Sequence, residues 1–298
     1  MQYLDDAIAD LQKEDLIDPE AQDLLYQGDA EKWLKLAYGL KARYTMHLLK
    51  RSANKDADME KVLEYVNNSF ESAEEQAAFD VYDANNINPL YGFFVARAGL
   101  GASESMRSKL AEYNDPRLSR AFITKQGTSG KEQAPGTADN AVYAPNGTPE
   151  QGTSKYGTSL FMYSISAPTL LLSYHELKFL EAEALCRLER DAKSALKDAV
   201  VAGLLNAENS FTISRKELGK TLINAASSIT EAEAESYFDN TIEAKYTAEP
   251  LKTTMTQKYF ALWGASGEAT ESYNDVRRMK GLGENFIELK NPNSFPLR

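Results

Sequence analysis

The sequence predicts a mainly α-helical protein, built of tetratricopeptide-like helical hairpins with long irregular loops and few short strands. Apolar residues recur every three or four positions over much of the chain, and helix-capping residues precede several of these stretches. Runs typical of strands are scarce. With 298 residues the chain is long enough to bury a large core without disulfide bonds. We therefore expect one domain over residues 1–298, with a long loop inserted at residues 125–159.

The N-terminal part of the chain contains three predicted helices. The first has its apolar residues on one face, at Leu4, Ala7, Ile8 and Leu11. Asp29 is the expected N-cap of a long helix that runs to about Arg51. A third helix is expected from about Asp58 to Phe70. Asn- and Asp-rich chain then replaces the helical pattern from Asp80 to Leu90.

Residues 125–159 are the least regular part of the chain. They contain six of the 17 glycines and five Gly-Thr dipeptides, and three prolines interrupt them further. No helix is expected to persist at such a density of helix breakers. Long loops inside compact domains are uncommon and often carry function, so this segment is a candidate binding region.

Helical patterns resume at Tyr174. Two apolar stripes separated by Asp191, the expected cap of the second helix, predict an antiparallel hairpin over Tyr174–Leu205. Ser214 and Thr230 are each followed three residues later by a glutamate, the signature of a capping box, so each is expected to open another helix. Pro250 is expected to start one more helix.

Charge and composition argue against several classes of protein. Lys and Arg number 33 against 44 Asp and Glu, and the net charge of −11 disfavours binding to nucleic acid or to an anionic membrane surface. No run of about 18 apolar residues is present, so no membrane-spanning helix is expected. Cys186 is the only cysteine, which leaves no partner for an intrachain disulfide. Because a helical pattern begins directly after Met1, we expect this sequence to be a piece of a longer protein.

Motifs of catalysis are missing from the sequence. His47 and His175 each lie alone in a helical pattern, where a packing or surface role is more common than acid–base chemistry. Neither a His-Glu-x-x-His nor a Gly-x-Ser-x-Gly pattern is present. Asp80, Asp83 or Asp139 could assist calcium binding, but they lack the spacing of a regular calcium loop. We expect a protein that is not an enzyme and has no cofactor.

The chain is rich in tyrosine, with 16 Tyr, 12 Phe and 2 Trp. A tyrosine ring combines an apolar face with a hydrogen-bonding tip, which suits the C–H faces and hydroxyls of a sugar. The candidate ligand-binding residues are Tyr143, Tyr156, Tyr91, Asn88 and Arg97. For the two loop tyrosines the alternative is to fix the loop to the body of the protein. For Tyr91 packing in the core is the more common role.

Several short motifs follow one another along the chain. They are Tyr-Gln-Gly-Asp-Ala-Glu-Lys-Trp at residues 26–33, Gly-Leu-Lys-Ala-Arg-Tyr-Thr-Met at 39–46, Asn-Pro-Leu-Tyr at 88–91, Asn-Asp-Pro-Arg-Leu at 114–118, Glu-Leu-Lys-Phe-Leu-Glu-Ala-Glu-Ala at 176–184, Gln-Lys-Tyr at 257–259, Glu-Ser-Tyr-Asn-Asp-Val-Arg-Arg at 271–278 and Phe-Pro-Leu-Arg at 295–298. In this order they resemble the signature of the SusD/RagB-like nutrient-binding outer-membrane lipoproteins. Tyr259 and Tyr273 depart from it, because tryptophan is usual in the family at these positions.

The resemblance implies a SusD-like fold and a non-catalytic function. A protein of this kind would capture a glycan or another nutrient at the bacterial cell surface and deliver it to a SusC-like TonB-dependent transporter. A lipid anchor would hold it in the outer membrane, and we expect the anchor, the N-terminal part and the final segment to lie outside this sequence. Variable loops such as residues 125–159 would set the ligand.

A second hypothesis is a helical-repeat scaffold whose ligand is another protein, with the Tyr174–Leu205 hairpin as part of its groove. Sugar binding that is lost on Tyr156→Ala would favour nutrient capture over this scaffold. A helical glycosidase is a third hypothesis, and it would need turnover of a glycan that one carboxylate substitution abolishes.

Overall fold

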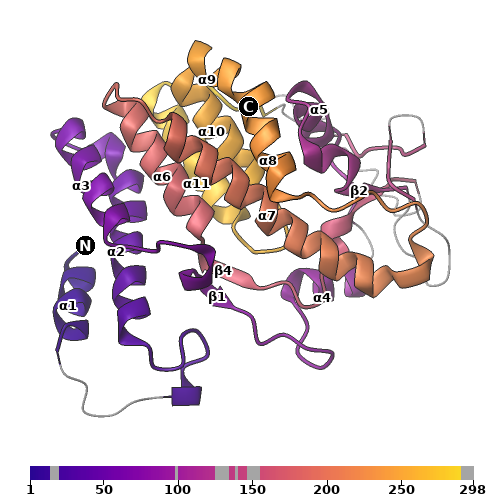
Figure 1. The fold of residues 1–298 in the computed structure, drawn as a ribbon, viewed down its shortest axis with the longest axis horizontal. Helices are drawn as coiled ribbons and strands as arrows, with labels where there is room; N and C mark the ends of the chain where they lie inside the picture. The colour runs from indigo at the N-terminus through magenta and orange to yellow at the C-terminus, as the bar shows by residue number, and fades with distance from the viewer. Residues whose placement is uncertain (14–19, 98–99, 125–133, 138–139, 146–154, 290–298) are drawn as a thin grey trace, which may run out of the picture. The chain divides into compact units, whose positions relative to one another are not determined.

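The computed structural model describes residues 1–13, 20–97, 100–124, 134–137, 140–145 and 155–289, with Arg97 described by its backbone only. Helices dominate these residues and the strands are short, which confirms the predicted fold class (Figure 1). The described residues form two compact units. We call the first, of Met1–Val81, Pro168–Gly203 and Ile242–Ile287, the helical unit, and the second, of Tyr82–Ala167, Leu204–Thr241 and residues 288–289, the loop-rich unit. Two such units can belong to one domain, so the single domain over 1–298 stays a prediction.

The helical unit is built of helices and one small antiparallel sheet. Its elements are α1 (Gln2–Leu11), α2 (Ala30–His47), α3 (Lys55–Asn67), α6 (Tyr174–Arg187), the first part of α7 (Lys193–Leu218), α9 (Glu243–Ala248), α10 (Pro250–Ala261), α11 (Ala269–Leu282) and the strands β1 (Ala77–Phe79) and β4 (Thr169–Leu172). In the sheet Ala77 pairs with Leu172 and Phe79 with Thr169, with a bulge between Ala77 and Ala78.

Side-chain caps determine where these helices begin. The Asp29 carboxylate accepts a hydrogen bond from the Lys32 backbone N–H, which confirms the predicted cap of α2. That helix ends at His47 rather than near Arg51, and its continuation is a 3-10 turn. Helix α3 starts earlier than predicted because the Asn54 side chain caps it. The predicted cap at Asp191 is confirmed, since its carboxylate accepts from the Lys193 N–H.

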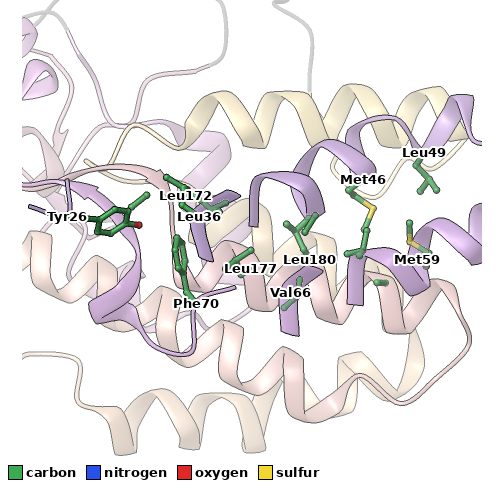
Figure 2. Packing of buried hydrophobic residues seen from close by; sticks show 14 residues of the cluster. Tyr26, Leu36, Met46, Leu49, Met59, Val66, Phe70, Leu172, Leu177 and Leu180 are labelled. Atoms are coloured by element: carbon green, nitrogen blue, oxygen red, sulfur yellow. The ribbon is translucent and has the colours of Figure 1, made fainter. Parts of the chain in front are cut away.

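A hydrophobic cluster fills the space between α2, α3 and α6 (Figure 2). Met46 of α2, Met59 of α3 and Leu177 of α6 are each at most 1% exposed. Leu172 of β4 joins the same cluster, so the small sheet is anchored to the helices. Burying a side chain of this size contributes roughly 1.5–3 kcal/mol, and this packing is the main source of stability in the region.

Helix α6 also has two buried carboxylates, each of which binds an arginine from another helix. Arg43 of α2 donates to Glu176 at 2.8 and 2.5 Å. Arg278 of α11 donates to both oxygens of Glu183 at 2.5 and 2.8 Å, and Arg187 donates to the same carboxylate at 2.8 Å. Burial would raise the pKa of Glu183, but the two guanidinium groups hold that pKa well below its usual range. The two glutamates of the motif at 176–184 therefore join helices.

Cys186 lies near the end of α6, where its side chain is half buried. Its Sγ is 3.6 Å from the Thr254 Oγ1 of α10. Burial raises the pKa of this thiol, so at neutral pH it is a poor nucleophile.

The loop-rich unit has shorter elements. They are α4 (Pro89–Arg97), α5 (Glu104–Glu112), the strand pair β2 (Phe122–Ile123) and β3 (Thr158–Ser159), the second part of α7, and α8 (Glu231–Tyr237), which a π-helical turn at Phe238–Ile242 follows. Its core contains stacked rings of Phe161 and Phe211, with centroids 4.6 Å apart. Asp115 and Arg117 form a buried ion pair in which Nε and Nη2 donate at 2.8 and 2.6 Å.

One of the two predicted capping boxes is correct. The Thr230 side chain accepts from the Glu233 N–H and opens α8. The prediction that Ser214 opens a helix is wrong, because Ser214 lies inside α7. Its hydroxyl donates to the Ser210 carbonyl one turn earlier and lies 2.7 Å from the Ser164 hydroxyl. A serine that bonds back to the preceding turn is compatible with a helix interior.

Candidate functional site

Tyr143 is half buried in the part of the predicted loop that the structure describes. Its ring packs edge-on against Phe122, with centroids 5.3 Å apart, and the Arg107 guanidinium lies 5.3 Å from the ring centre. Gly136 approaches closely, since a Cβ there would lie 3.2 Å from the Tyr143 hydroxyl oxygen. Burial raises the pKa of Tyr143, and Arg107 opposes this rise. Tyr143 thus fixes its segment and still has a partly accessible ring.

Tyr156 is only 4% exposed. A Cβ on Gly101 would lie 3.1 Å from the Tyr156 Cβ, so the absence of a side chain at Gly101 makes room for this ring. The Lys155 ammonium lies 5.6 Å from the ring centre. Tyr156 therefore has the alternative role considered for it, that of fixing the loop, and its ring has little surface for a ligand. The rest of the loop (125–133, 138–139 and 146–154) lies outside the described residues.

Asn88 is used by the fold. It is 1% exposed, and its side-chain oxygen accepts from the Leu90 N–H at 2.8 Å at the start of α4. Its side-chain nitrogen donates to the Ala167 carbonyl at 2.8 Å. Both ends of the amide are occupied, so we do not keep Asn88 in the candidate site.

Tyr91 follows on the same helix and is half buried. Its hydroxyl donates to the Glu217 carboxylate at 3.0 Å, and burial together with Glu217 raises the pKa of Tyr91. Part of the ring remains accessible, so Tyr91 stays a candidate. Arg97 is the last residue of α4, but its side chain lies outside the described residues. The structure thus places Tyr91 and Arg97 on α4 with Asn88 directly before it, and it does not unite Tyr91 and Asn88 with the loop tyrosines in a described pocket.

The aspartates considered for calcium are not gathered into one site. The Asp83 carboxylate accepts from the Asn85 and Asn86 N–H groups, both at 2.7 Å, which closes a local turn. Asp80 is exposed, and Asp139 lies outside the described residues. Across the described ranges, no three His, Cys, Asp or Glu side chains converge as metal ligands would.

One hollow lies in the helical unit, between α3 and α6. These two helices pack side by side (Figure 1). They run antiparallel, since Arg190 beyond the end of α6 is ion-paired with Glu60 of α3, and the Tyr174 N–H at the start of α6 donates to Gln76 beyond the end of α3. The groove between them has a volume of about 700 Å³. We call it the α3–α6 groove. A second hollow, in the loop-rich unit beside Phe122 and Arg120, has a volume of about 10 Å³, room for a single water.

Sequence reasoning missed the α3–α6 groove. Its two sides come from segments far apart in the chain, the predicted helix after Asp58 and the one after Tyr174. The available signal was the polar face of the first of these helices, on which Glu64 and Asn67 are exposed at successive turns. Such a face is usually only solvated, so nothing in the sequence distinguishes it before the helices are paired.

No helix in the described ranges combines the length and the apolar character needed to cross a membrane.

A SusD-like family model, described as starch-binding and associating with the outer membrane, matches residues 1–280. Comparison with curated proteins gives no match.

Solved structures resemble the chain over nearly its whole length. A SusD/RagB family protein from Bacteroides thetaiotaomicron is 65% identical, with a TM-score of 0.94, over 98% of this chain and 62% of that protein. A SusD homologue from Bacteroides fragilis is 19% identical with a TM-score of 0.68, over 95% of this chain and 62% of that protein. A chitin-binding protein is 19% identical with a TM-score of 0.62, over 93% of this chain and 58% of that protein. At 19% identity only the fold is shared, and the chain spans 58–62% of the length of these three relatives.

Proposed function

The chain belongs to the SusD-like family, described as starch-binding and associating with the outer membrane, and on this premise we propose that it captures a glycan at the bacterial cell surface without altering it chemically. The observation that carries the proposal is the family match over residues 1–280. The 65% identical relative from Bacteroides thetaiotaomicron supports it. The same match confirms the resemblance and the SusD-like fold predicted from the order of the motifs.

The finer parts of the proposal concern the full-length protein. It would be held in the outer membrane by a lipid anchor and would deliver its ligand to a SusC-like TonB-dependent transporter. Starch-type α-glucans are the first ligands to test, because the family description names starch. Chitin fragments are the second, because one structural relative is a chitin-binding protein.

The arrangement of the histidines favours binding over catalysis. His47 Nε2 lies 2.8 Å from Glu271 Oε2 and joins α2 to α11. His175 Nε2 lies 3.2 Å from Glu268 Oε2, with both side chains at most 2% exposed. Each histidine is thus paired with a carboxylate inside the helical scaffold, where it stabilises the packing of helices.

Calorimetric titration of the chain with a panel of malto-, chito- and cello-oligosaccharides tests the proposal. We expect saturable binding of at least one neutral sugar and no released products after prolonged incubation. Tyr143→Ala is the informative variant for the loop, because Tyr143 is half buried while Tyr156→Ala would mainly report on folding. Tyr3→Ala is the matched control, since Tyr3 is an 89% exposed tyrosine on α1.

A loss of affinity with Tyr143→Ala but not with Tyr3→Ala would assign sugar contact to the loop. Unchanged affinity in both variants would place the sugar elsewhere and leave glycan capture standing. Binding of a protein partner with no response to any sugar would contradict glycan capture and favour the scaffold hypothesis.

A further inference from the structure

The α3–α6 groove contains polar groups that the fold does not use. Among the described residues, the Glu64 carboxylate, the Asn67 side-chain amide and the Tyr174 hydroxyl have no hydrogen-bond partner. The charged residues around them are largely engaged: Lys178 lies 2.5 Å from Glu181, and Arg190 is paired with Glu60. A groove with an unused carboxylate, amide and hydroxyl is equipped to bind a ligand rich in hydroxyl groups.

Most of the remaining lining is apolar. Leu63 and Leu185 are half buried on opposite sides of the groove, and the half-buried Tyr174 ring lies near one end of it. A tyrosine ring and aliphatic side chains match the C–H face of a pyranose, while the polar groups match its hydroxyls. The lining along α3, from Glu60 to Asn67, extends over roughly 10 Å, so the groove suits a short linear ligand.

Charge selects a neutral ligand over an acidic one. Four carboxylates line the groove, from Glu60, Glu64, Glu71 and Glu181, against the two cations of Lys178 and Arg190. Because both cations are already paired, an anionic ligand would meet the unpaired Glu64 without a free positive charge to offset it. Glycans with carboxylate or sulfate groups are therefore disfavoured.

A helix from another protein fits the groove less well than a sugar does. Helix-in-groove binding relies on apolar anchors that enter an apolar floor. Here the floor residues Val66 and Phe70 are only 8% and 4% exposed, because they already pack in the hydrophobic cluster. What the groove offers at its surface is mainly polar, as a sugar site requires.

We propose that the α3–α6 groove binds a short neutral oligosaccharide, with the Tyr174 ring against a sugar face and with Glu64, Asn67 and the Tyr174 hydroxyl bonded to sugar hydroxyls. The proposal rests on glycan capture as the function of the protein. It adds a location in the helical unit and a preference for uncharged sugars.

Titration with maltotetraose, chitotetraose and tetragalacturonate tests the groove. Glu64→Gln/Asn67→Ala removes the charge of one bonding group and the whole of the other, both at exposed positions, so the fold should persist. We expect the dissociation constant of the neutral tetrasaccharide that binds to rise about tenfold or more. Tyr174→Phe keeps the ring but removes the hydroxyl, and it should raise the same dissociation constant about fivefold. Asp56→Asn makes the same charge change at an exposed position of α3 outside the groove, and it should leave the dissociation constant unchanged.

Several outcomes would overturn the groove proposal. Neutral sugar binding that is unaffected by Glu64→Gln/Asn67→Ala would reject the groove and leave glycan capture intact. Tetragalacturonate binding as tightly as the neutral sugars would reject the charge argument. If the double variant keeps its sugar affinity but no longer retains the transporter in a pull-down, the groove is a protein contact. If the chain binds none of the three sugars, the groove proposal fails, and glycan capture fails with it once the whole oligosaccharide panel is also negative.

Discussion

The helical unit and the loop-rich unit both bury arginine–carboxylate pairs, but at very different separations in the sequence. In the helical unit the Arg43–Glu176 pair spans 133 positions and the Arg278–Glu183 pair spans 95. In the loop-rich unit Arg117 bonds to Asp115, only two positions away. The distant pairs join helices, whereas the local pair fixes one turn.

The two kinds of pair also differ in what else the paired residues bind. Arg278 bonds to Asp275 as well as to Glu183, and Arg187 bonds to Glu284 as well as to Glu183. In the loop-rich unit the acid itself has several partners, since Asp115 accepts from the Arg117 side chain, from the Arg117 backbone N–H and from the Tyr237 hydroxyl. We therefore expect the local pair to be the more sensitive one to loss of its acid.

The largest effect is expected for Asp115→Asn. It removes the charge that the 2% exposed Arg117 faces, while the amide oxygen of Asn can still cap the Pro116–Ser119 turn. We expect the free energy of unfolding to fall by about 3–5 kcal/mol, as measured by urea denaturation. Glu112→Gln, at an exposed position three residues earlier, should change it by less than about 0.5 kcal/mol.

A smaller effect is expected for Glu183→Gln in the helical unit. Arg278 and Arg187 lose one carboxylate but keep Asp275 and Glu284, so we expect a loss of about 2–3 kcal/mol. Hydrogen exchange should show faster opening of α6 and α11. Glu181→Gln on the same helix is the control, with little expected change. If the Glu183 variant is less stable than the Asp115 variant, the distant pairs and not the local pair are the more sensitive to loss of the acid.

The smallest effect concerns the partly exposed contact between His47 and Glu271, and it depends on pH. Burial would raise the pKa of Glu271, but the hydrogen bond from His47 and the nearby Arg43 lower it to about 2. A carboxylate with a depressed pKa stabilises the fold above its unfolded value of about 4.5 and loses this contribution as the pH falls toward 2. Glu271→Gln should therefore cost about 1 kcal/mol at neutral pH.

The same variant should also make the decline of stability between pH 4.5 and 2 less steep than in the parent chain. Thermal melts across this range provide the measurement. The exposed Glu235→Gln serves as the control and should follow the parent. An unchanged slope in Glu271→Gln would show that this contact does not contribute to acid stability.

Most of the helical unit could be predicted from the sequence, because its signals are local. Asp29 and Asp191 cap helices as their positions predict, as Thr230 does in the loop-rich unit, and the apolar spacing finds the helices that follow. Ser214 has the same local signature but lies inside α7, since its hydroxyl bonds to the turn before it and to Ser164. Whether Ser214 opens a helix or lies inside one depends on a tertiary contact, which a four-residue motif does not contain.

The candidate site was harder to predict, for a related reason. An asparagine such as Asn88 can contact a ligand or cap a helix as a buried amide, and the sequence alone does not distinguish the two roles. Tyr156 lies in a glycine-rich loop but is buried, because the loop itself packs against the body of its unit. The α3–α6 groove exists only once two distant helices are paired, so neither helix alone predicts it.

The single half-buried thiol of Cys186 gives this protein a built-in reporter of its internal motion. With one cysteine in the chain, an alkylating reagent can modify one site only, and the site lies where α6 meets α10. Its raised pKa keeps the reactive thiolate scarce while the two helices are packed. Because the thiol is half buried, its basal alkylation rate sets a reference, and a faster rate under mildly destabilising conditions would report separation of α6 from α10 without any introduced label.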